Sequence, residues 1–210
     1  MACNNLRMAA FASILVASLS LGASNVFAQQ KTSGFYVGGS AGVASMLDLS
    51  NICNNTLPAR GVSTTTCDNK GFAKKGFVGY QFIQYFGVEL GYYDFGKGTI
   101  KTASGGNIEF KARGPYAGIV ISAPLLDRLS FIGRVGVIRW STKFNADSAS
   151  GVASASDNGI NGAFGVGLEY MFTDTFGMRA EVERFSTIGD DASTGQTNIN
   201  MYSVSGLFRF

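Results

Sequence analysis

Side chains in this chain alternate between apolar and small or polar types with a period of two residues, and no other feature constrains the fold as strongly. The clearest segment covers residues 160–172. One of its faces carries Ile160, Gly162, Phe164, Val166, Leu168, Tyr170 and Phe172. The opposite face carries Asn161, Ala163, Gly165, Gly167, Glu169 and Met171. Two residues is the side-chain period of an extended strand, so the segment is predicted to be a β-strand with one apolar face.

Segments of this kind recur along the chain and together predict eight strands. The others are Phe35–Met46, Phe72–Phe82, Phe86–Phe95, Ile108–Ala123, Leu129–Lys143, Phe176–Phe185 and a last segment that ends at residue 210. In that last segment the apolar face carries Tyr202, Val204, Phe208 and Phe210, and Gly206 interrupts it. The faces of the segment 129–143 stay unassigned, because Arg134 and Arg139 have opposite parity. One of these arginines must lie near a rim or follow a bulge.

The links between the segments alternate in length. Short links are expected at 83–85, 124–128 and 173–175, and long polar loops at 47–71, 96–107, 144–159 and 186–198. Short turns on one side and long loops on the other are typical of outer-membrane barrels. No segment after residue 28 approaches 18 consecutive apolar residues, so a membrane-spanning form would have to be a closed barrel rather than a helix.

We therefore predict an all-β fold, an eight-stranded antiparallel up-and-down transmembrane β-barrel. Its apolar faces would contact lipid, and its small or charged faces would line a narrow hydrophilic lumen. A soluble lipocalin-like barrel is the alternative. That fold needs an apolar interior, the reverse of what Glu169 among glycines indicates.

The first 28 residues differ from the rest of the chain. Arg7 is their only charge, an apolar stretch follows it, and Val26-Phe27-Ala28 suits a signal peptidase. The prediction is a cleaved signal peptide at 1–28 and a barrel domain at 29–210. A signal anchor is the alternative, since the 21 uncharged residues from 8 to 28 approach the roughly 20 that span a bilayer.

The net charge bears on the kind of partner that the chain can bind, and the cysteine content bears on disulfide formation. Removing Arg7 leaves 16 basic and 14 acidic residues, a net charge of 16 − 14 = +2, which implies no nucleic-acid partner. Cys3 leaves with the signal peptide. Cys53 and Cys67 remain as an even pair in an exported chain, so we expect a disulfide between them, with two free thiols as the alternative.

Catalytic chemistry finds little support in the sequence. The chain contains no histidine, which excludes Ser–His and Cys–His nucleophiles and most zinc sites. Enzymes that need only carboxylates are not excluded in this way, and Glu181 and Glu183 are candidates for an acid/base pair. Carboxylates two residues apart on a strand more often face cations in a lumen. We expect no enzyme activity, no cofactor and no metal.

Several short motifs, in their order and spacing, resemble the transmembrane domain of the outer membrane protein A family. The motifs are FYVGGSAG at 35–42, GYQ at 79–81, VELGY at 88–92, GLEY at 167–170, MRAE at 178–181 and FRF at 208–210. They cover nearly all of the chain after the signal peptide. The resemblance implies an eight-stranded barrel whose lumen is plugged by carboxylates and basic side chains.

The resemblance places Glu89, Glu169 and Arg179 in that interior network. The interior lysine of the family falls on Val120, so one member is missing, and this puts inherited switching of the salt bridges in doubt. Charges confined in a lumen must be compensated. We therefore expect Arg179, with Arg134 if it faces inward, to neutralise Glu89, Glu169 and Glu181, unless some of these side chains are solvated near a rim.

The end of the chain also resembles a known signal. A terminal aromatic residue with apolar residues at alternate positions before it is similar to the signal that the barrel-assembly machinery reads. The residues concerned are Tyr202, Val204, Phe208 and Phe210. Full-length family members carry a peptidoglycan-binding domain after the barrel, and this sequence stops at Phe210, so that tether is not expected.

The functional prediction is a structural and surface-interaction protein of the bacterial outer membrane. Side chains fill an eight-stranded barrel, which excludes a high-flux porin. The expected partners are outer-membrane lipids and lipopolysaccharide, the barrel-assembly machinery, and host or matrix ligands at the extracellular loops. The alternative function is a narrow, low-conductance channel gated by the interior Glu/Arg network.

Overall fold

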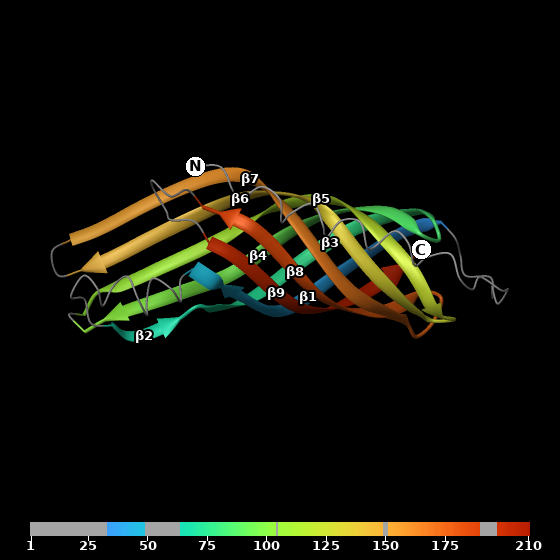
Figure 1. The fold of residues 1–210 in the computed structure, drawn as a ribbon, viewed down its shortest axis with the longest axis horizontal. Helices are drawn as coiled ribbons and strands as arrows, with labels where there is room; N and C mark the ends of the chain where they lie inside the picture. Colours follow the sequence, from blue (N-terminus) through green and yellow to red (C-terminus); the bar gives the residue numbers. More distant parts are fainter. Residues whose placement is uncertain (1–32, 49–63, 104, 149–150, 190–196) are drawn as a thin grey trace, which may run out of the picture.

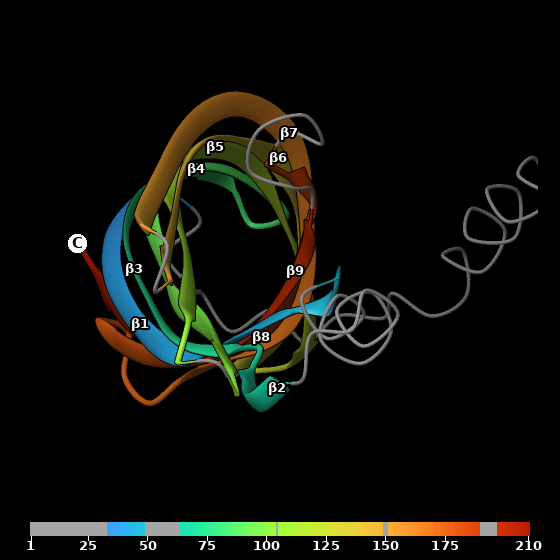
Figure 2. The ribbon, with the colours of Figure 1, turned by 90° about the vertical axis from the view of Figure 1, so that its left-hand side faces the viewer.

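The strands of the protein close into a ring. A computed structural model describes residues 33–48, 64–103, 105–148, 151–189 and 197–210. Within these ranges the strands are β1 (Gly34–Met46), β2 (Thr64–Asp68), β3 (Lys70–Ile83), β4 (Phe86–Thr102), β5 (Asn107–Leu126), β6 (Leu129–Ser148), β7 (Gly151–Met171), β8 (Phe176–Ile188) and β9 (Thr197–Arg209). β1 pairs with β3 and β9, and the pairing of β4 with β5 joins the two ends of the sheet (Figures 1 and 2).

Eight strands make the wall of this ring, each antiparallel to its neighbours, as the alternating pattern predicted. The ninth, β2, is not a further wall strand. It precedes β3, is separated from it by Asn69, and pairs with the far end of β4, where Cys67 lies opposite Ile100. Cys53 and the segment 1–28 lie outside the described residues, so the disulfide and the signal peptide stay predictions.

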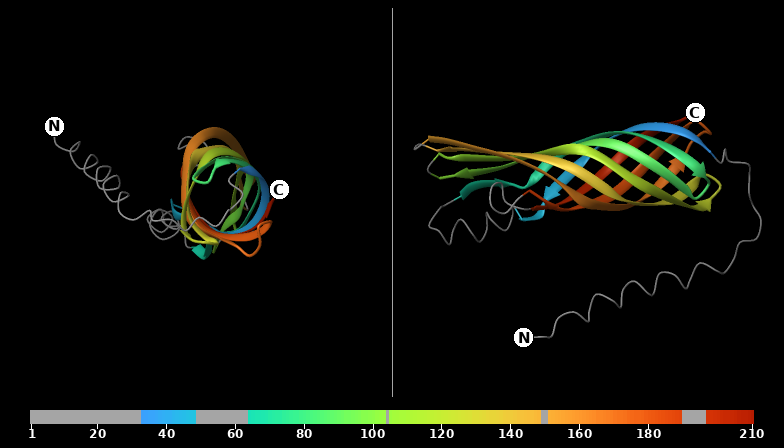
Figure 3. Two further views of the ribbon diagram at one scale, coloured as in Figure 1. Left: turned by 90° about the vertical axis from the view of Figure 1, so that its right-hand side faces the viewer. Right: turned by 90° about the horizontal axis from the view of Figure 1, so that it is seen from above.

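Two of the long loops expected from the sequence are mostly strand. The range 96–107 is the tip of the β4–β5 hairpin, and 144–159 belongs to β6 and β7, whose pairing runs unbroken to Ser148 opposite Gly151. The loop prediction was wrong at 96–107 because glycine and polar residues dominate that segment, although Ile100 is buried. It was wrong at 144–159 because the described side chains on both faces of that hairpin are at least partly exposed. The alternation of side chains is then lost although the backbone ladder continues. These hairpins project past the ring on one side (Figures 1 and 3).

The faces of the strands follow the predicted parity. On β7 Ile160 is 66 % exposed and Phe164 54 %, whereas Glu169 is 2 % exposed. The unassigned strand β6 pairs with β7 without a register shift, so Arg134 faces inward and Arg139 faces outward. No bulge separates the two arginines, and Arg139 is exposed on the outer face of β6.

Aromatic side chains surround the turn end of the ring, where the short links lie. Ring pairs there include Phe35 with Tyr80, whose centroids are 4.7 Å apart, and Phe176 with Phe208 at 4.9 Å. Tyr202 and Val204 face outward on β9, and Phe210 is exposed just after it. An outward apolar band with aromatic residues at its edge suits a lipid environment. Among the described residues, no helix has the length and apolarity needed to span a bilayer.

Candidate functional site

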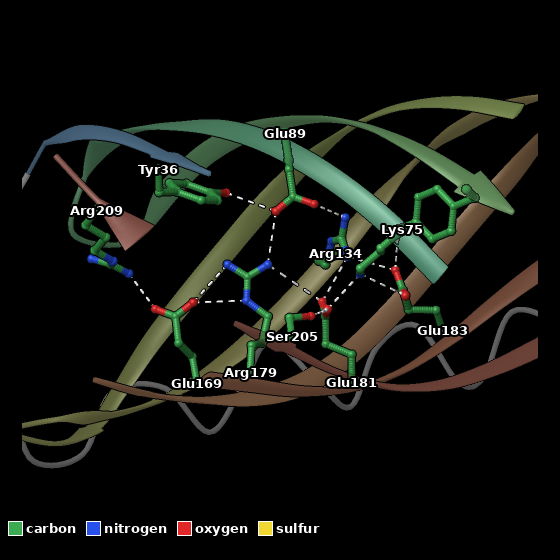
Figure 4. Close-up of polar contacts among 11 residues, drawn as sticks. Tyr36, Lys75, Glu89, Arg134, Glu169, Arg179, Glu181, Glu183, Ser205 and Arg209 are labelled. Carbon is green, nitrogen blue, oxygen red and sulfur yellow. Dashed lines mark hydrogen bonds and ion pairs between the residues drawn. The ribbon is translucent and has the colours of Figure 1, made fainter. Parts of the chain in front are cut away.

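Eight charged side chains meet inside the ring at its turn end and form what we call the charged cluster (Figure 4). Its members are Lys75 on β3, Glu89 on β4, Arg134 on β6, Glu169 on β7, Arg179, Glu181 and Glu183 on β8, and Arg209 on β9. Apart from Arg209, each is at most 5 % exposed. Four cations face four carboxylates, so the cluster is neutral, as burial of so many charges requires.

Arg179 holds one side of the charged cluster together. Its Nε and Nη2 atoms donate to Oε2 of Glu169 at 2.9 and 2.8 Å, and its Nη1 donates to Oε2 of Glu89 at 3.0 Å. Glu169 and Arg179 are direct cross-strand partners on β7 and β8, so the strand register itself brings them together. Arg209 donates to the other oxygen of Glu169.

Arg134 holds the other side. Its Nη1 donates to Glu181 at 2.9 Å and to Glu183 at 2.8 Å, and its Nη2 donates to Glu89. Val120, the position where the resemblance places the family's lysine, is buried and lies directly opposite Arg134 in the β5–β6 pairing. In this chain the cation therefore comes from the neighbouring strand.

Lys75 is a member that the sequence analysis missed. Its Nζ donates to Glu181 at 2.7 Å and to Glu183 at 2.9 Å, so the two carboxylates considered as an acid/base pair both bind cations. A signal was available, because Lys74 and Lys75 are consecutive and one side chain of such a pair on a strand must face inward.

Tyrosine hydroxyl groups donate further hydrogen bonds to two of the buried carboxylates. Tyr36 donates to Glu89 at 3.1 Å, and Tyr93 donates to Glu183 at 2.6 Å. With these bonds each of the four buried carboxylates accepts from at least two donors, which is the condition under which buried charge is tolerated. The carboxylates are thereby saturated. Among the described residues, no group of histidine, cysteine, aspartate and glutamate side chains could hold a metal ion.

Apolar side chains fill the interior at the loop end and form what we call the apolar cluster. Its members are Ala44, Met46, Ala73, Tyr93, Phe95, Phe110, Ala112, Tyr116, Ile138, Trp140, Ala163, Phe185, Ile188, Ile199 and Met201. The rings of Phe95 and Phe185 pack edge to face with centroids 4.7 Å apart. The expectation of a lumen lined only by small or charged side chains was therefore wrong for this half. Packed apolar side chains fill this half of the interior, whereas ion pairs fill the other half.

Little free space remains beside the charged cluster. A cavity of about 10 Å³ lined by Tyr36, Val120, Arg179 and Arg209, among others, has room for at most one water molecule. The arrangement neutralises charge, fixes the strands that carry it and obstructs the lumen. Every carboxylate of the charged cluster is held by at least one cation.

Comparisons with known proteins agree with this geometry. The family model described as the OmpA-like transmembrane domain matches residues 30–210. Outer membrane protein A of Yersinia pseudotuberculosis is 31 % identical over 186 residues, which cover 87 % of this chain and 50 % of the relative. Outer membrane protein P5 of Haemophilus influenzae is 31 % identical over 170 residues, covering 74 % and 46 %. The chain thus spans about half the length of these relatives.

Two solved structures show the same fold. Neisserial surface protein A superposes with a TM-score of 0.55 at 15 % identity, covering 84 % of this chain and 97 % of that one. Ail, the attachment invasion locus protein of Yersinia pestis, in complex with the heparin analogue sucrose octasulfate, gives a TM-score of 0.52 at 16 % identity, covering 85 % and 97 %. Both likenesses concern the architecture alone.

Proposed function

Because the chain belongs to the family of OmpA-like transmembrane domains and is an outer-membrane barrel protein, we propose that it acts as a structural element and surface ligand-binding protein. The observation that carries this proposal is a contrast between the interior and the projecting hairpins. The interior is occupied by saturated ion pairs and packed rings. The β4–β5 and β6–β7 hairpins extend well past the ring (Figure 3). Side chains on them such as Lys101, Ser154 and Ser156 are exposed.

The interior argues against the alternative, a narrow gated channel. An ion crossing the barrel would have to displace Arg179 or Arg134 from two or three carboxylates each. It would then meet the apolar cluster, where Phe95, Phe185 and Ile138 offer no polar partner to a dehydrated ion. Nor does the charged cluster support an enzyme, because its carboxylates are all held by cations.

The loop end supports recognition of host or matrix ligands. β6 and β7 carry polar side chains on both faces beyond the wall, and residues there such as Lys143, Ser154 and Ser156 are exposed. Polar residues held on a rigid ladder suit binding to a surface ligand. Since the structure of Ail was solved with a heparin analogue, sulfated glycans are the first ligand class to test.

Export and assembly belong to the same proposal. Residues 1–28 would direct the chain through the inner membrane and be removed. Tyr202, Val204, Phe208 and Phe210, at the end of the closing strand β9, would be read by the barrel-assembly machinery, and the assembled barrel would contact outer-membrane lipids and lipopolysaccharide. In the oxidising periplasm Cys53 would form a disulfide with Cys67 and restrain the segment that precedes β3.

Shortening one hairpin tests the proposal. Residues 144–155 are replaced by Asn-Gly, so that Lys143 and Ser156, which are cross-strand partners, close a tight hairpin and the wall below stays intact. Cells that display the wild-type chain are expected to bind heparin fragments or matrix proteins, and the shortened chain to lose most of that binding. The control is Asp174→Asn in the opposite turn. Equal binding by both variants, or no binding by the wild type, would reject the proposal.

A further inference from the structure

The second arm of the projecting β6–β7 hairpin has one neighbouring strand instead of two. β7 pairs with β6 down to Gly151, but its pairing with β8 begins only at Ala163, opposite Phe185. Figure 1 shows β7 along the border of the projecting sheet, while β8 ends much closer to the ring. Among the described residues, the stretch 151–162 therefore has no strand on its second side, and we call it the free edge.

The backbone hydrogen bonds of β7 show which groups point to this second side. The N–H of Met171 donates to a carbonyl in the turn that leads into β6, and the N–H of Phe172 donates to β8, both at 2.9 Å. The ladder between β6 and β7 has no register shift, so odd-numbered residues of β7 point toward β6 and even-numbered residues point away from it. Along the free edge, the N–H and C=O groups of residues such as Ser154 and Ser156 thus point to a side where the structure describes no strand.

The opposite border of the projecting sheet is formed differently. There the edge strand is β2, which is 5 residues long, includes the charged Asp68 and shifts register between Thr64 and Thr66. Short length, charge and irregularity are means by which proteins prevent an edge strand from pairing with another chain. The free edge is longer and regular, it contains neither lysine nor proline, and Asp157 is its only charged residue. It is therefore open to pairing with a further strand.

The side chains of the free edge indicate which strand fits. Edges that bind foreign peptides gain specificity from pockets that take alternate side chains of the peptide. The stretch 154–159 carries only alanine, serine, aspartate, asparagine and glycine, and each of these residues is exposed or partly exposed. Side chains this small line no such pocket, and they suit a partner edge that is equally flat and uncharged. A second copy of the free edge has these properties.

The membrane determines how two free edges can meet. Two copies in one membrane point their β7 strands in the same direction, and a two-fold axis along the membrane normal places each residue beside its equivalent. A parallel ladder does not form in that arrangement, because a residue that points toward the partner strand must lie opposite one that points away. Two copies in facing membranes run antiparallel, and a two-fold axis across the strands then pairs them symmetrically.

We propose that the free edge joins this chain to a second copy on a neighbouring cell through an antiparallel β7–β7 ladder. With the two-fold axis at Ser156, Ser154 lies opposite Asn158 of the second copy, and Asp157 lies opposite Ala155, so no like charges meet. One pair of strands is weak by itself, and the many copies on each cell supply the strength. This inference goes beyond the proposed glycan binding and does not depend on it.

The test mixes cells that carry two different fluorescent labels and counts mixed aggregates by microscopy. Two populations that display the wild-type chain are expected to form two-colour aggregates, and cells without the chain should stay outside them. Ser156→Pro removes an N–H that points to the free edge but none that pairs with β6, so aggregation should be lost. Ser156→Ala keeps that N–H and is the matched control, with aggregation as in the wild type. Electrophoretic mobility in detergent with and without boiling verifies that each variant is folded.

A charge exchange tests self-pairing with variants that keep every backbone donor. Cells that display Ser154→Lys with Asn158→Lys, and cells that display Ser154→Asp with Asn158→Asp, should each stay dispersed alone, because like charges then lie opposite each other. A mixture of the two populations should form two-colour aggregates.

Four results would overturn the proposal. Wild-type cells could stay dispersed, or the mixture of the charge-exchanged populations could do so. Folded Ser156→Pro could aggregate like the wild type, or Ser156→Ala could lose aggregation to the same extent. Recruitment of cells without the chain would also reject a second copy as the partner and indicate a foreign strand instead.

Discussion

The two halves of the lumen are filled by opposite chemistry on the same strands. Along β8 the inward side chains are Arg179, Glu181 and Glu183 at the turn end and then Phe185 at the loop end. In the charged cluster each group depends on named partners from other strands, and in the apolar cluster the phenylalanine rings depend only on volume. The difference shows that a lumen can be closed either by ion pairs or by apolar packing. Only the charged half, however, ties particular strands to one another.

The largest effect is expected where one charge loses its partners. Arg179→Met leaves Glu169 and Glu89 without their shared cation in a buried site, which should lower the free energy of unfolding by about 4 to 5 kcal/mol. The measurement is urea unfolding of the refolded barrel in lipid vesicles. Arg139→Met, on the outer face, is the control and should change stability little. A loss below about 1 kcal/mol for Arg179→Met would show that the charged half is not held as described.

The apolar half should respond to lost volume. Phe185→Ala removes a fully buried ring that packs on Phe95 and Tyr93, so the free energy of unfolding should fall by about 3 kcal/mol. Phe185→Leu, which leaves a smaller void, should cost clearly less in the same unfolding assay. If the two variants were equally stable, packing would not be what fills this half.

A double substitution sharpens the contrast between the halves. When Glu169→Gln is added to Arg179→Met, three cations again face three carboxylates in the charged cluster, and about 2 kcal/mol of the loss should return. Adding Phe95→Ala to Phe185→Ala should instead increase the loss, because no partner is relieved. The two double-mutant cycles are measured by the same unfolding assay. The distinction between the halves would be lost if adding Phe95→Ala also restored stability, or if adding Glu169→Gln increased the loss.

Tyr93 lies at the boundary, since its ring belongs to the apolar cluster and its hydroxyl donates to Glu183. Tyr93→Phe keeps the ring and removes one donor to a buried carboxylate that retains Arg134 and Lys75. The expected loss in the free energy of unfolding is about 1 to 2 kcal/mol, smaller than that of Arg179→Met or Phe185→Ala. Tyr92→Phe on the lipid-facing side is the matched control, and an equal loss there would contradict the assignment.

The smallest effect is expected for charges that water already solvates. Hydrogen bonds from Lys111 and then Lys97 lower the pKa of Glu109 on the projecting hairpin. A carboxylate with a lowered folded pKa adds stability above its unfolded pKa, and this contribution is lost as the pH falls through the folded pKa. An NMR titration of Glu109 should show the lowered pKa return toward its ordinary value in Lys111→Gln. If the pKa of Glu109 did not change in that variant, Lys111 would not be the cause of its lowered value.

The sequence predicted the features that depend on the residue pattern of a single strand, and it missed some that depend on contacts between distant strands. Parity along one strand was enough for the eight-stranded ring and for outward residues such as Phe164. It failed at 144–159, because a strand in water on both sides shows no alternation. In the charged cluster Glu89, Glu169 and Arg179 came from family resemblance, whereas Lys75 was missed. Its contacts with Glu181 and Glu183 depend on which strands face each other across the lumen, and no short-range pattern records that.

The most direct test of the account is an ion-current recording across a planar bilayer that contains the folded protein. The charged and apolar clusters together obstruct the lumen, so we expect a silent bilayer without discrete open levels. Stable open levels in the wild type, altered in size or frequency by Arg179→Met, would contradict the account and favour a gated channel.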